Sequence, residues 1–331
     1  MKRYLERVRH PEWYHGHHRK PPYFEGWYFK LVSADGRQRA AIIPGLFKSD
    51  DPEQNHAFVQ VLDGVTGQVV YHRFPADAFC AAPDRFEVTV GASRFTDRYV
   101  ALQLSGPEQT LYGEVHFEGV TPWPVRLVSP GIMGPFGWLE KMECNHGVLS
   151  LDHGLRGTAV VDGRVVDWTG GRGYIEKDWG AAFPSAWVWM QSNHFETPGT
   201  CLTASIATIP VGPFWFRGTI VGLWHEGRLY RFATYNGARV EHLGIDEQRV
   251  TWALRARGHR LEIHAARAEG GLLRGPSTQA MGVRVPETLS ATIGVRLSRL
   301  GGRQPEVILE DTGRYGGLEV VGDLERLARE K

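Results

Sequence analysis

The chain has 331 residues, of which 42% are hydrophobic and 23% are charged, and its 38 basic and 37 acidic side chains leave a net charge of +1. This balance predicts no basic field for nucleic acid. The N-terminus shows no leader-like apolar segment, no run of about 18 apolar residues follows, and the three cysteines are isolated, so we expect a cytoplasmic protein with reduced thiols.

Short runs that alternate apolar and polar residues follow one another along the first half, from "YFEGWYFKLV" to "RVVDWTG". They are bounded by turn signals at Asp35-Gly36, Asp63-Gly64 and Asp162-Gly163. The second half repeats the pattern, from "GTCLTASIATI" to "GGLEVVGD". Many short strands with regular turns predict an all-β protein built as an antiparallel sandwich or barrel. Only the charged tail "GDLERLAREK" predicts a helix, a short C-terminal one capped by Asp323.

A weak internal repeat predicts two β-domains. Trp27 lies in the strand "FEGWYFK", and Trp187 lies in the strand "SAWVWMQ" 160 positions later. We therefore expect an N-terminal domain at residues 1–182 and a C-terminal domain at 183–331. One extended sandwich is the alternative.

Residues 121–138, "TPWPVRLVSPGIMGPFGW", form an unusually apolar loop with four prolines and one charge, Arg126. Loops of this length are often lids or ligand contacts, and the apolarity argues against disorder. The loop is interpreted as a pocket cover or a transient membrane contact, with a packed irregular crossing between strands as the alternative.

The segment "GYIEKDWG" at 173–180 carries the strongest chemical signal. On an extended strand Tyr174, Glu176 and Asp178 share one face, and Lys177 and Trp179 share the other. Two nearby carboxylates in apolar surroundings favour protonation of one of them, which would make a general acid. The alternative is a charge cluster, neutralised by Lys177, that only joins two domains.

Two further strands contribute candidate binding residues. In "FEGWYFK", Trp27 is expected to pack in the barrel, whereas Glu25 is expected to face a cavity or to bind an arginine. In "WVWMQSN", two indole rings and two amides share a face, as suits a pocket wall with few polar anchors; an ordinary core is the alternative. These residues are Trp187, Trp189, Gln191 and Asn193.

Other motifs are discounted. His146 in "MECNHG" is judged neither an acid–base partner nor a metal ligand, because adjacent residues on a strand point to opposite sides. "HGHH" at 15–18 is interpreted as a polar turn rather than a zinc site. No nucleophile elbow, phosphate loop or dinucleotide fingerprint occurs, so chemistry without cofactor or metal, or plain binding, is predicted.

Five segments together resemble the tocopherol cyclase family: "FEGWYFK", "MECNHGVLSLDH", "GRGYIEKDWG", "FPSAWVWMQSN" and "GGLEVVGD". More distantly, the chain is similar to carotenoid 1,2-hydratases and AttH-like lipocalin proteins. The resemblance runs from about residue 10 to the C-terminus. It implies two lipocalin-like antiparallel β-barrel domains packed side by side, with a hydrophobic prenyl-type substrate near their interface and no cofactor.

The resemblance also implies a mechanism. Tocopherol cyclases close a prenylated hydroquinone into a chromanol, which begins with protonation of an alkene to a tertiary cation. Glu176 is the expected acid, assisted by Tyr174 or Asp178. The hydratases' upstream histidine and tryptophan have no clear match, which favours cyclisation over hydration. Expected substrate contacts come from Glu25 and Trp179, from cation-stabilising rings and from amides that orient the hydroxyls: Trp27, Trp187, Trp189, Gln191 and Asn193.

The prediction is therefore a cofactor-independent cyclase of tocopherol cyclase type that acts on a prenylated quinol or related isoprenoid. A non-catalytic carrier of a hydrophobic ligand is the alternative. The expected partner is a hydrophobic small molecule, with transient membrane-surface contact and no nucleic acid. The substrate, its stereochemistry and the oligomeric state do not follow from the sequence.

Overall fold

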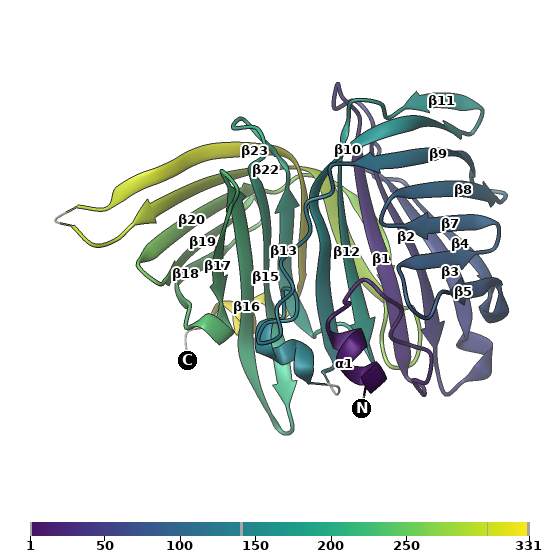
Figure 1. The fold of residues 1–331 in the computed structure, drawn as a ribbon, viewed down its shortest axis with the longest axis horizontal. Coiled ribbons are helices and arrows are strands. Elements are labelled where there is room, and N and C mark those ends of the chain that lie inside the picture. The colour runs from purple at the N-terminus through teal and green to yellow at the C-terminus, as the bar shows by residue number, and fades with distance from the viewer. Residues whose placement is uncertain (1, 140–141, 303, 330–331) are drawn as a thin grey trace. The chain divides into compact units, whose positions relative to one another are not determined.

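The computed structural model describes residues 2–139, 142–302 and 304–329 (Figure 1). Backbone contacts divide the chain into two compact units. The first comprises Met1–Phe183 with Leu272–Arg284, and the second comprises Pro184–Gly271 with Val285–Lys331. Both are built from antiparallel strands, so the predicted all-β class is confirmed. Whether the units fold independently, as two domains divided at residue 182, stays a prediction.

Within the described residues, the first sheet has 12 strands in the order β4-β3-β2-β1-β12-β10-β9-β8-β7-β6-β5, with β11 paired to β10. Its strands are β1 (Tyr23–Val32), β2 (Arg39–Lys48), β3 (His56–Asp63), β4 (Val69–Pro75), β5 (Phe79–Ala81), β6 (Glu87–Val90), β7 (Ser93–Thr96), β8 (Tyr99–Ser105), β9 (Thr110–Glu118), β10 (Cys144–Val161), β11 (Arg164–Asp167) and β12 (Arg172–Gly180).

One face of this sheet packs around a single apolar core. Val59 of β3 and Val88 of β6 lie near opposite ends of the strand order, yet both belong to the same cluster as Trp27 and Phe29 of β1. The sheet must therefore curl around these side chains. Strands β1, β12 and β10 are adjacent at its middle, and they carry the candidate site.

The N-terminal residues form a helix that the sequence did not predict, α1 (Lys2–Val8). Seven residues are too few for a stable isolated helix, and two tertiary contacts hold this one. Tyr4 donates its hydroxyl to the carbonyl of Trp138, and the carbonyl of Arg7 accepts from Nε2 of His15 at 3.2 Å. Single-turn 3₁₀ segments occur at η1 (Pro52–Gln54), η2 (Ala76–Ala78), η3 (Gly134–Trp138) and η4 (Thr234–Asn236).

The apolar loop 121–138 is partly packed and partly exposed. Trp123 and Ile132 are buried, and the loop ends in η3. Between them, Arg126 and Ser129 form an isolated bridge, and Leu127 and Val128 are 66% and 75% exposed. The two ends of the loop are therefore packed, as an irregular crossing between strands would be. Its apolar tip faces solvent.

Among the described residues, a second sheet has 11 strands in the order β17-β16-β15-β13-β23-β22-β20-β19-β18, with β14 paired to β23 and β21 to β22. Its strands are β13 (Ala186–Ser192), β14 (His194–Phe195), β15 (Cys201–Val211), β16 (Phe214–His225), β17 (Arg228–Ala233), β18 (Arg239–Ile245), β19 (Arg249–Ala256), β20 (His259–Ala266), β21 (Gly271–Gly275), β22 (Val283–Arg299) and β23 (Glu306–Gly322). Apart from residues 272–275 of β21 and 283–284 of β22, these strands belong to the second unit.

This second sheet has its own core. Val188 and Met190 of β13 share it with Trp252 of β19 and Ile293 of β22. The predicted C-terminal helix is confirmed as α2 (Leu324–Ala328), and Asp323 caps it by accepting from the backbone amide of Arg326. Residues 330 and 331 of the predicted tail lie outside the described residues.

Tight turns explain several of the hairpins. Asp162 and Gly163 have φ of 50° and 80° between the paired residues Val161 and Arg164, as a two-residue type I′ turn requires. Glu226-Gly227 and Arg257-Gly258 show the same positive φ pair. Those two turns lack the Asp-Gly signal, so glycine at the second turn position is the sequence feature that all three turns share.

The segment Leu272–Arg284 lies within the predicted C-terminal domain but joins the first unit. The backbone amide of Arg274 donates to Oε1 of Gln60 at 2.7 Å, and Nε2 of Gln60 donates to the carbonyl of Arg274 at 3.3 Å. The guanidinium of Arg274 also lies 4.7 Å from the centroid of the Tyr71 ring. These contacts are formed across more than 200 residues of sequence, so a linear domain boundary does not capture them.

Candidate active site

Strand β12 presents two different chemical clusters on its two faces. Tyr174, Glu176 and Asp178 point to the face away from the first core, whereas Ile175, a core residue, and Lys177 point to the other. The alternation predicted from "GYIEKDWG" is therefore present. β12 lies between β1 and β10, so each face also receives side chains from these neighbours.

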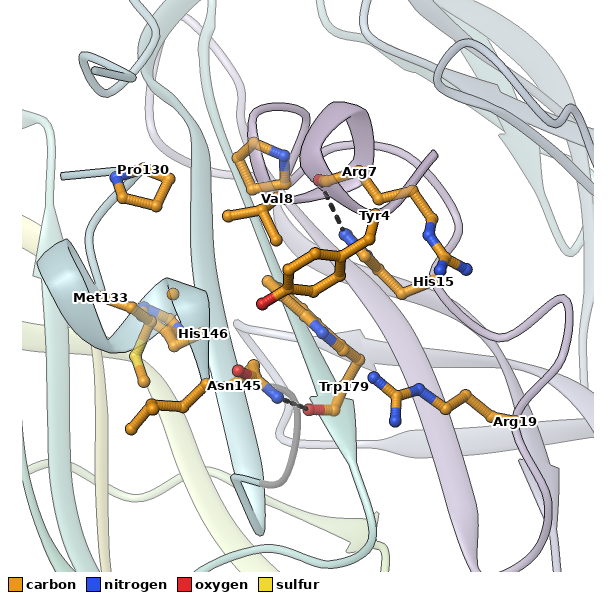
Figure 2. A pocket seen from close by; sticks show the side chains of 13 residues that line it. Tyr4, Arg7, Val8, His15, Arg19, Pro130, Met133, Asn145, His146 and Trp179 are labelled. Carbon is orange, nitrogen blue, oxygen red and sulfur yellow. Dashed lines mark hydrogen bonds between the residues drawn. The ribbon is translucent and has the colours of Figure 1, made fainter. Parts of the chain in front are cut away.

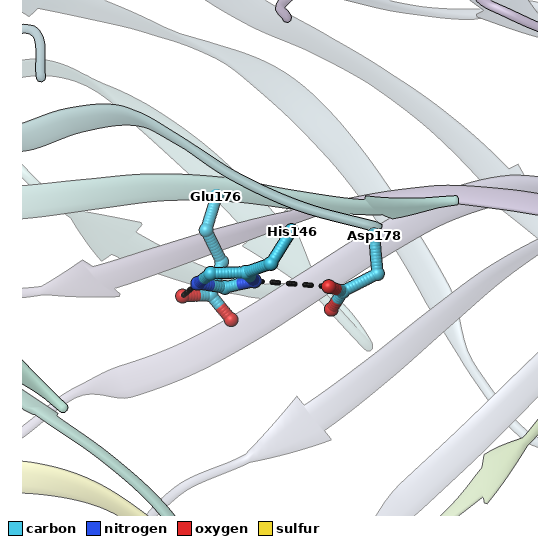
Figure 3. Close-up of side chains that lie close together, drawn as sticks. All are labelled: His146, Glu176 and Asp178. Carbon is cyan, nitrogen blue, oxygen red and sulfur yellow. Dashed lines mark hydrogen bonds and ion pairs between the residues drawn. The ribbon is translucent and has the colours of Figure 1, made fainter. Parts of the chain in front are cut away.

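The first cluster consists of Tyr174, Glu176, His146 and Asp178, and we call it the Glu176 cluster. Tyr174 donates its hydroxyl to Oε2 of Glu176 at 2.5 Å. The same oxygen lies 3.7 Å from Nε2 of His146. On the other side of the ring, Nδ1 of His146 lies 2.9 Å from Oδ1 of Asp178. The imidazole is therefore held between two carboxylates (Figure 3).

Cross-strand register brings His146 into this cluster. His146 on β10 pairs directly with Asp178 on β12, so the two side chains emerge on the same face. The sequence interpretation compared His146 only with its neighbours along the chain and dismissed it. The reason for that dismissal was wrong, because the carboxylate beside His146 lies 32 positions away and is brought there by strand register. Whether His146 acts in acid–base chemistry or binds a metal stays untested.

The ring of His146 is positively charged at neutral pH. Burial opposes the charged form, but the attraction of Asp178 and Glu176 prevails and raises the pKa of His146 to about 9. The sequence interpretation relied on repulsion between two carboxylates. An imidazolium between them compensates that repulsion, so the acidity of this cluster depends on three groups rather than two.

This ring gives the fold a pH-dependent stability. Its folded pKa of about 9 lies above the ordinary 6.5, so its contribution is complete below pH 6.5 and is lost as the pH rises through 9. A shift of this size corresponds to about 3 kcal/mol. We expect the free energy of unfolding of the wild type to fall across this window and that of His146→Gln to stay flat. Denaturant titrations through the window measure both, and parallel curves would contradict the assignment.

The Glu176 cluster also has the donor types of a metal site. Its nitrogen and two carboxylates lie within 4.8 Å of one another. Nδ1 of His146 is engaged by Asp178, so an ion would use Nε2 and Glu176 and take the place of a proton. The expectation that no metal is needed stays a prediction, which activity after treatment with a chelator tests.

The second cluster lies on the opposite face and is organised by Lys177; we call it the Lys177 cluster. Nζ of Lys177 is 2.7 Å from Oε1 of Glu25, and both side chains are fully buried. Lys177 also donates to the carbonyls of Pro11, at 2.9 Å, and Trp13, and to Nδ1 of His15 at 2.8 Å. The N-terminal segment is thus tied to β12.

Glu25 is fully occupied by donors. It accepts from the backbone amide of His15 at 3.0 Å and from the hydroxyl of Tyr23, in addition to Lys177. Burial opposes its ionisation, but Lys177 and His15 outweigh burial and hold the pKa of Glu25 at about 2. The predicted arginine partner is wrong; the cation is a lysine from the neighbouring strand.

Two of the predicted substrate-binding rings face this lysine. Nζ of Lys177 lies 5.0 Å from the ring centroid of Trp27 and 4.4 Å from that of Trp179. Trp27 is completely buried, and Trp179 stacks on His15 with centroids 4.6 Å apart. Their observed role is cation–π stabilisation of an ammonium group. Contact of either ring, or of Glu25, with a substrate stays a prediction.

The remaining candidates lie on β13 of the second unit. Trp187, Trp189 and Gln191 share the face opposite Val188 and Met190, as alternation predicts. The indole Nε1 of Trp187 donates to Oε2 of Glu319 at 2.6 Å. Just beyond the strand, Oδ1 of Asn193 lies 2.9 Å from Nδ1 of His194. Their part in binding a substrate stays a prediction.

A pocket opens beside the Glu176 cluster (Figure 2). The N-terminal segment contributes Tyr4 and Arg7, the apolar loop contributes Pro130 and Met133, and His146 forms part of the wall. The loop 121–138 is therefore a pocket contact in addition to a crossing. The full lining is Tyr4, Arg7, Val8, Pro11, His15, Arg19, Pro130, Met133, Gly137, Leu139, Asn145, His146 and Trp179.

Part of the chain that carries this site matches a known protein family. Residues 136–322, which include β10, β12 and β13, match the family model described as tocopherol cyclase-like. The chain belongs to the tocopherol cyclase-like family. The resemblance found in its motifs is confirmed, and the matched region contains every member of the Glu176 cluster.

Relatives of known name share part of their length with this chain. The chloroplastic tocopherol cyclase of Zea mays is 30% identical over 213 residues, which are 60% of this chain and 42% of the maize protein. The probable tocopherol cyclase of Oryza sativa subsp. japonica is 30% identical over 209 residues, 56% of this chain and 42% of the rice protein. The match thus spans less than half of each plant protein.

The fold is similar to that of a solved structure. A putative AttH from Nitrosomonas europaea superposes with a TM-score of 0.54 at 14% sequence identity, covering 90% of this chain and 92% of that one. This likeness concerns the fold alone. No helix among the described residues is long and apolar enough to cross a membrane.

Proposed function

We propose that this protein is a cofactor-independent cyclase that protonates a trisubstituted alkene of a prenylated quinol or related isoprenoid and closes a ring by oxygen attack. Membership of the tocopherol cyclase-like family supports a cyclase function. The observation that carries the proposal is the Glu176 cluster, in which a buried carboxyl group faces a phenol and an imidazolium.

Glu176 is the general acid in this proposal. In the reactive form Glu176 is neutral, and its Oε1 carries the proton that is transferred to the less substituted alkene carbon while the alkene electron pair forms the new C–H bond. Tyr174 donates its hydroxyl to Oε2, and Nε2 of His146 lies 3.7 Å from the same oxygen. Both groups therefore stabilise the carboxylate that remains after the transfer. Asp178 holds His146 in the charged form and fixes its orientation.

The tertiary cation then reacts with oxygen. A phenol oxygen of the substrate attacks the cation, the C–O bond closes the ring, and the phenol proton returns to Glu176. Substrate and product are isomers, so the cycle consumes no cofactor and releases no proton. Stabilisation of the cation by Trp187 and Trp189, and orientation of the quinol hydroxyls by Gln191 and Asn193, belong to the same proposal.

The test is conversion of a hydroquinone that carries a geranyl chain. The purified protein, treated with a chelator, should yield a chromanol of identical mass and different chromatographic retention. A protein that binds the hydroquinone and returns it unchanged would overturn the proposed cyclisation. Loss of activity on chelation, restored by a divalent metal, would overturn the metal-free mechanism.

A further inference from the structure

The hairpin formed by β15 and β16 extends beyond the sheet to which it belongs. The two strands pair from Cys201 and Trp224 to Val211 and Phe214. Among the described residues, β13 pairs with β15 only over 202–207, and β17 pairs with β16 only over 220–225. Residues 208–219 therefore form a two-stranded ribbon that projects past its neighbours (Figure 1).

The tip of this ribbon is apolar and exposed. Residues 209–216 read "IPVGPFWF" and contain no charged side chain. Val211 is 57% exposed and Phe214 is 75% exposed. The turn end of a projecting ribbon is exposed to water, so polar residues would normally occupy it. A contiguous apolar tip in this position indicates a contact with an apolar partner.

Basic side chains surround the base of the tip. Arg217 follows it directly and donates to the carbonyls of Leu327 and Arg329 at 3.3 and 3.5 Å. The guanidinium of Arg326 lies 4.3 Å from the ring centroid of Trp215. Two acidic residues belong to the same helical segment: Glu325, which lies 3.6 Å from Arg329, and Asp323, whose Oδ1 accepts from the backbone amide of Arg326. The order from the tip inward is thus apolar residues, an indole ring and then arginines.

We propose that the tip of the β15–β16 hairpin docks the protein on an anionic lipid surface. Aromatic residues favour the boundary between headgroups and acyl chains, and arginines favour anionic headgroups. Val211 and Phe214 enter that boundary, while Arg217 and Arg326 remain at headgroup level. The sequence offered loop 121–138 as either a pocket cover or a membrane contact; the proposal places the membrane contact on this hairpin.

Docking has a reason in the proposed function, because a prenylated quinol dissolves in membranes. The docking itself does not depend on that function and can be measured without any substrate. It is also compatible with the absence of a spanning helix among the described residues, since a hairpin tip enters only the interface.

The experiment is flotation of the full-length protein with vesicles of equal amounts of phosphatidylcholine and phosphatidylglycerol. The variant Val211→Asp/Phe214→Asp should bind these vesicles at least about tenfold more weakly than the wild type. The matched control is Val65→Asp/Val165→Asp, which places two acids at valines that are 51% and 67% exposed elsewhere. It should bind like the wild type. Arg326→Gln should bind these anionic vesicles more weakly than the wild type does. It should bind vesicles of phosphatidylcholine alone as the wild type does.

Three results would overturn the proposal. The wild type could fail to bind vesicles, the hairpin variant could bind as well as the control, or Leu127→Asp/Val128→Asp could abolish binding while the hairpin variant retains it. A hairpin variant that loses self-association in size-exclusion chromatography, with no vesicle binding by the wild type, would assign the tip to a second copy. Conversion of a short-chain, water-soluble hydroquinone should be equal in the wild type, the hairpin variant and the valine control, which separates docking from catalysis.

Discussion

Replacing Glu176 with glutamine should lower turnover by at least about 100-fold while substrate affinity changes little. The amide keeps the size of the side chain and can still accept the hydroxyl of Tyr174, but it has no acidic proton to give. The turnover number measured by product chromatography and the dissociation constant measured by quenching of tryptophan fluorescence separate the two effects. Retained turnover in Glu176→Gln would place the acid elsewhere.

The matched control is Glu143→Gln. Glu143 is a half-buried glutamate immediately before β10, and burial raises its pKa, yet it has no part in the Glu176 cluster. Its replacement should leave turnover unchanged.

Asp178→Asn acts through His146, so it should lower turnover less than Glu176→Gln does. It removes the stronger of the two carboxylate attractions that raise the pKa of His146. The alkaline limb of the pH profile of turnover should therefore move to lower pH.

Replacing Glu25 with glutamine should reduce the free energy of unfolding by about 3–5 kcal/mol. The change leaves the fully buried ammonium of Lys177 without its counter-charge, 5.0 Å from the ring centroid of Trp27. Denaturant titration at neutral pH measures the loss. A change below about 1 kcal/mol, the usual value for an exposed pair, would show that the ion pair is not desolvated in solution.

A double replacement provides the control for this prediction. Glu25→Leu/Lys177→Met removes both charges together, so it should recover much of the stability that Glu25→Gln loses.

The same pair makes the stability of the fold sensitive to acid. The folded pKa of Glu25 is about 2, below its ordinary 4.5, so its contribution to the free energy of unfolding is present above pH 4.5 and is lost as the pH falls toward 2. Glu25→Gln should lack this loss of stability at low pH.

The alternation of residues along the sequence was sufficient to predict those features of the fold and the site that depend on a single strand. Alternation correctly placed Tyr174, Glu176 and Asp178 on one face of β12, and Trp187 and Trp189 on one face of β13, because the side-chain period of a strand is two. The C-terminal helix was predicted from its cap.

Contacts across strands could not be predicted in this way. The pairing of His146 with Asp178, and of Glu25 with Trp179, depends on the register of three strands. The β10–β12 pair contains two register shifts, between Val148 and His153, which no alternation pattern reveals. The N-terminal segment was missed for the same reason, since His15 reaches Lys177 only once β12 is in place.

The most direct test of the central claim, protonation of an alkene by Glu176, is a single-turnover reaction in deuterium oxide. We expect one deuterium in the chromanol, at the alkene carbon that does not bond to oxygen, and no labelled product with Glu176→Gln. A chromanol without deuterium would contradict protonation as the first chemical step. Tight binding of the hydroquinone with no product would make the protein a carrier of its ligand.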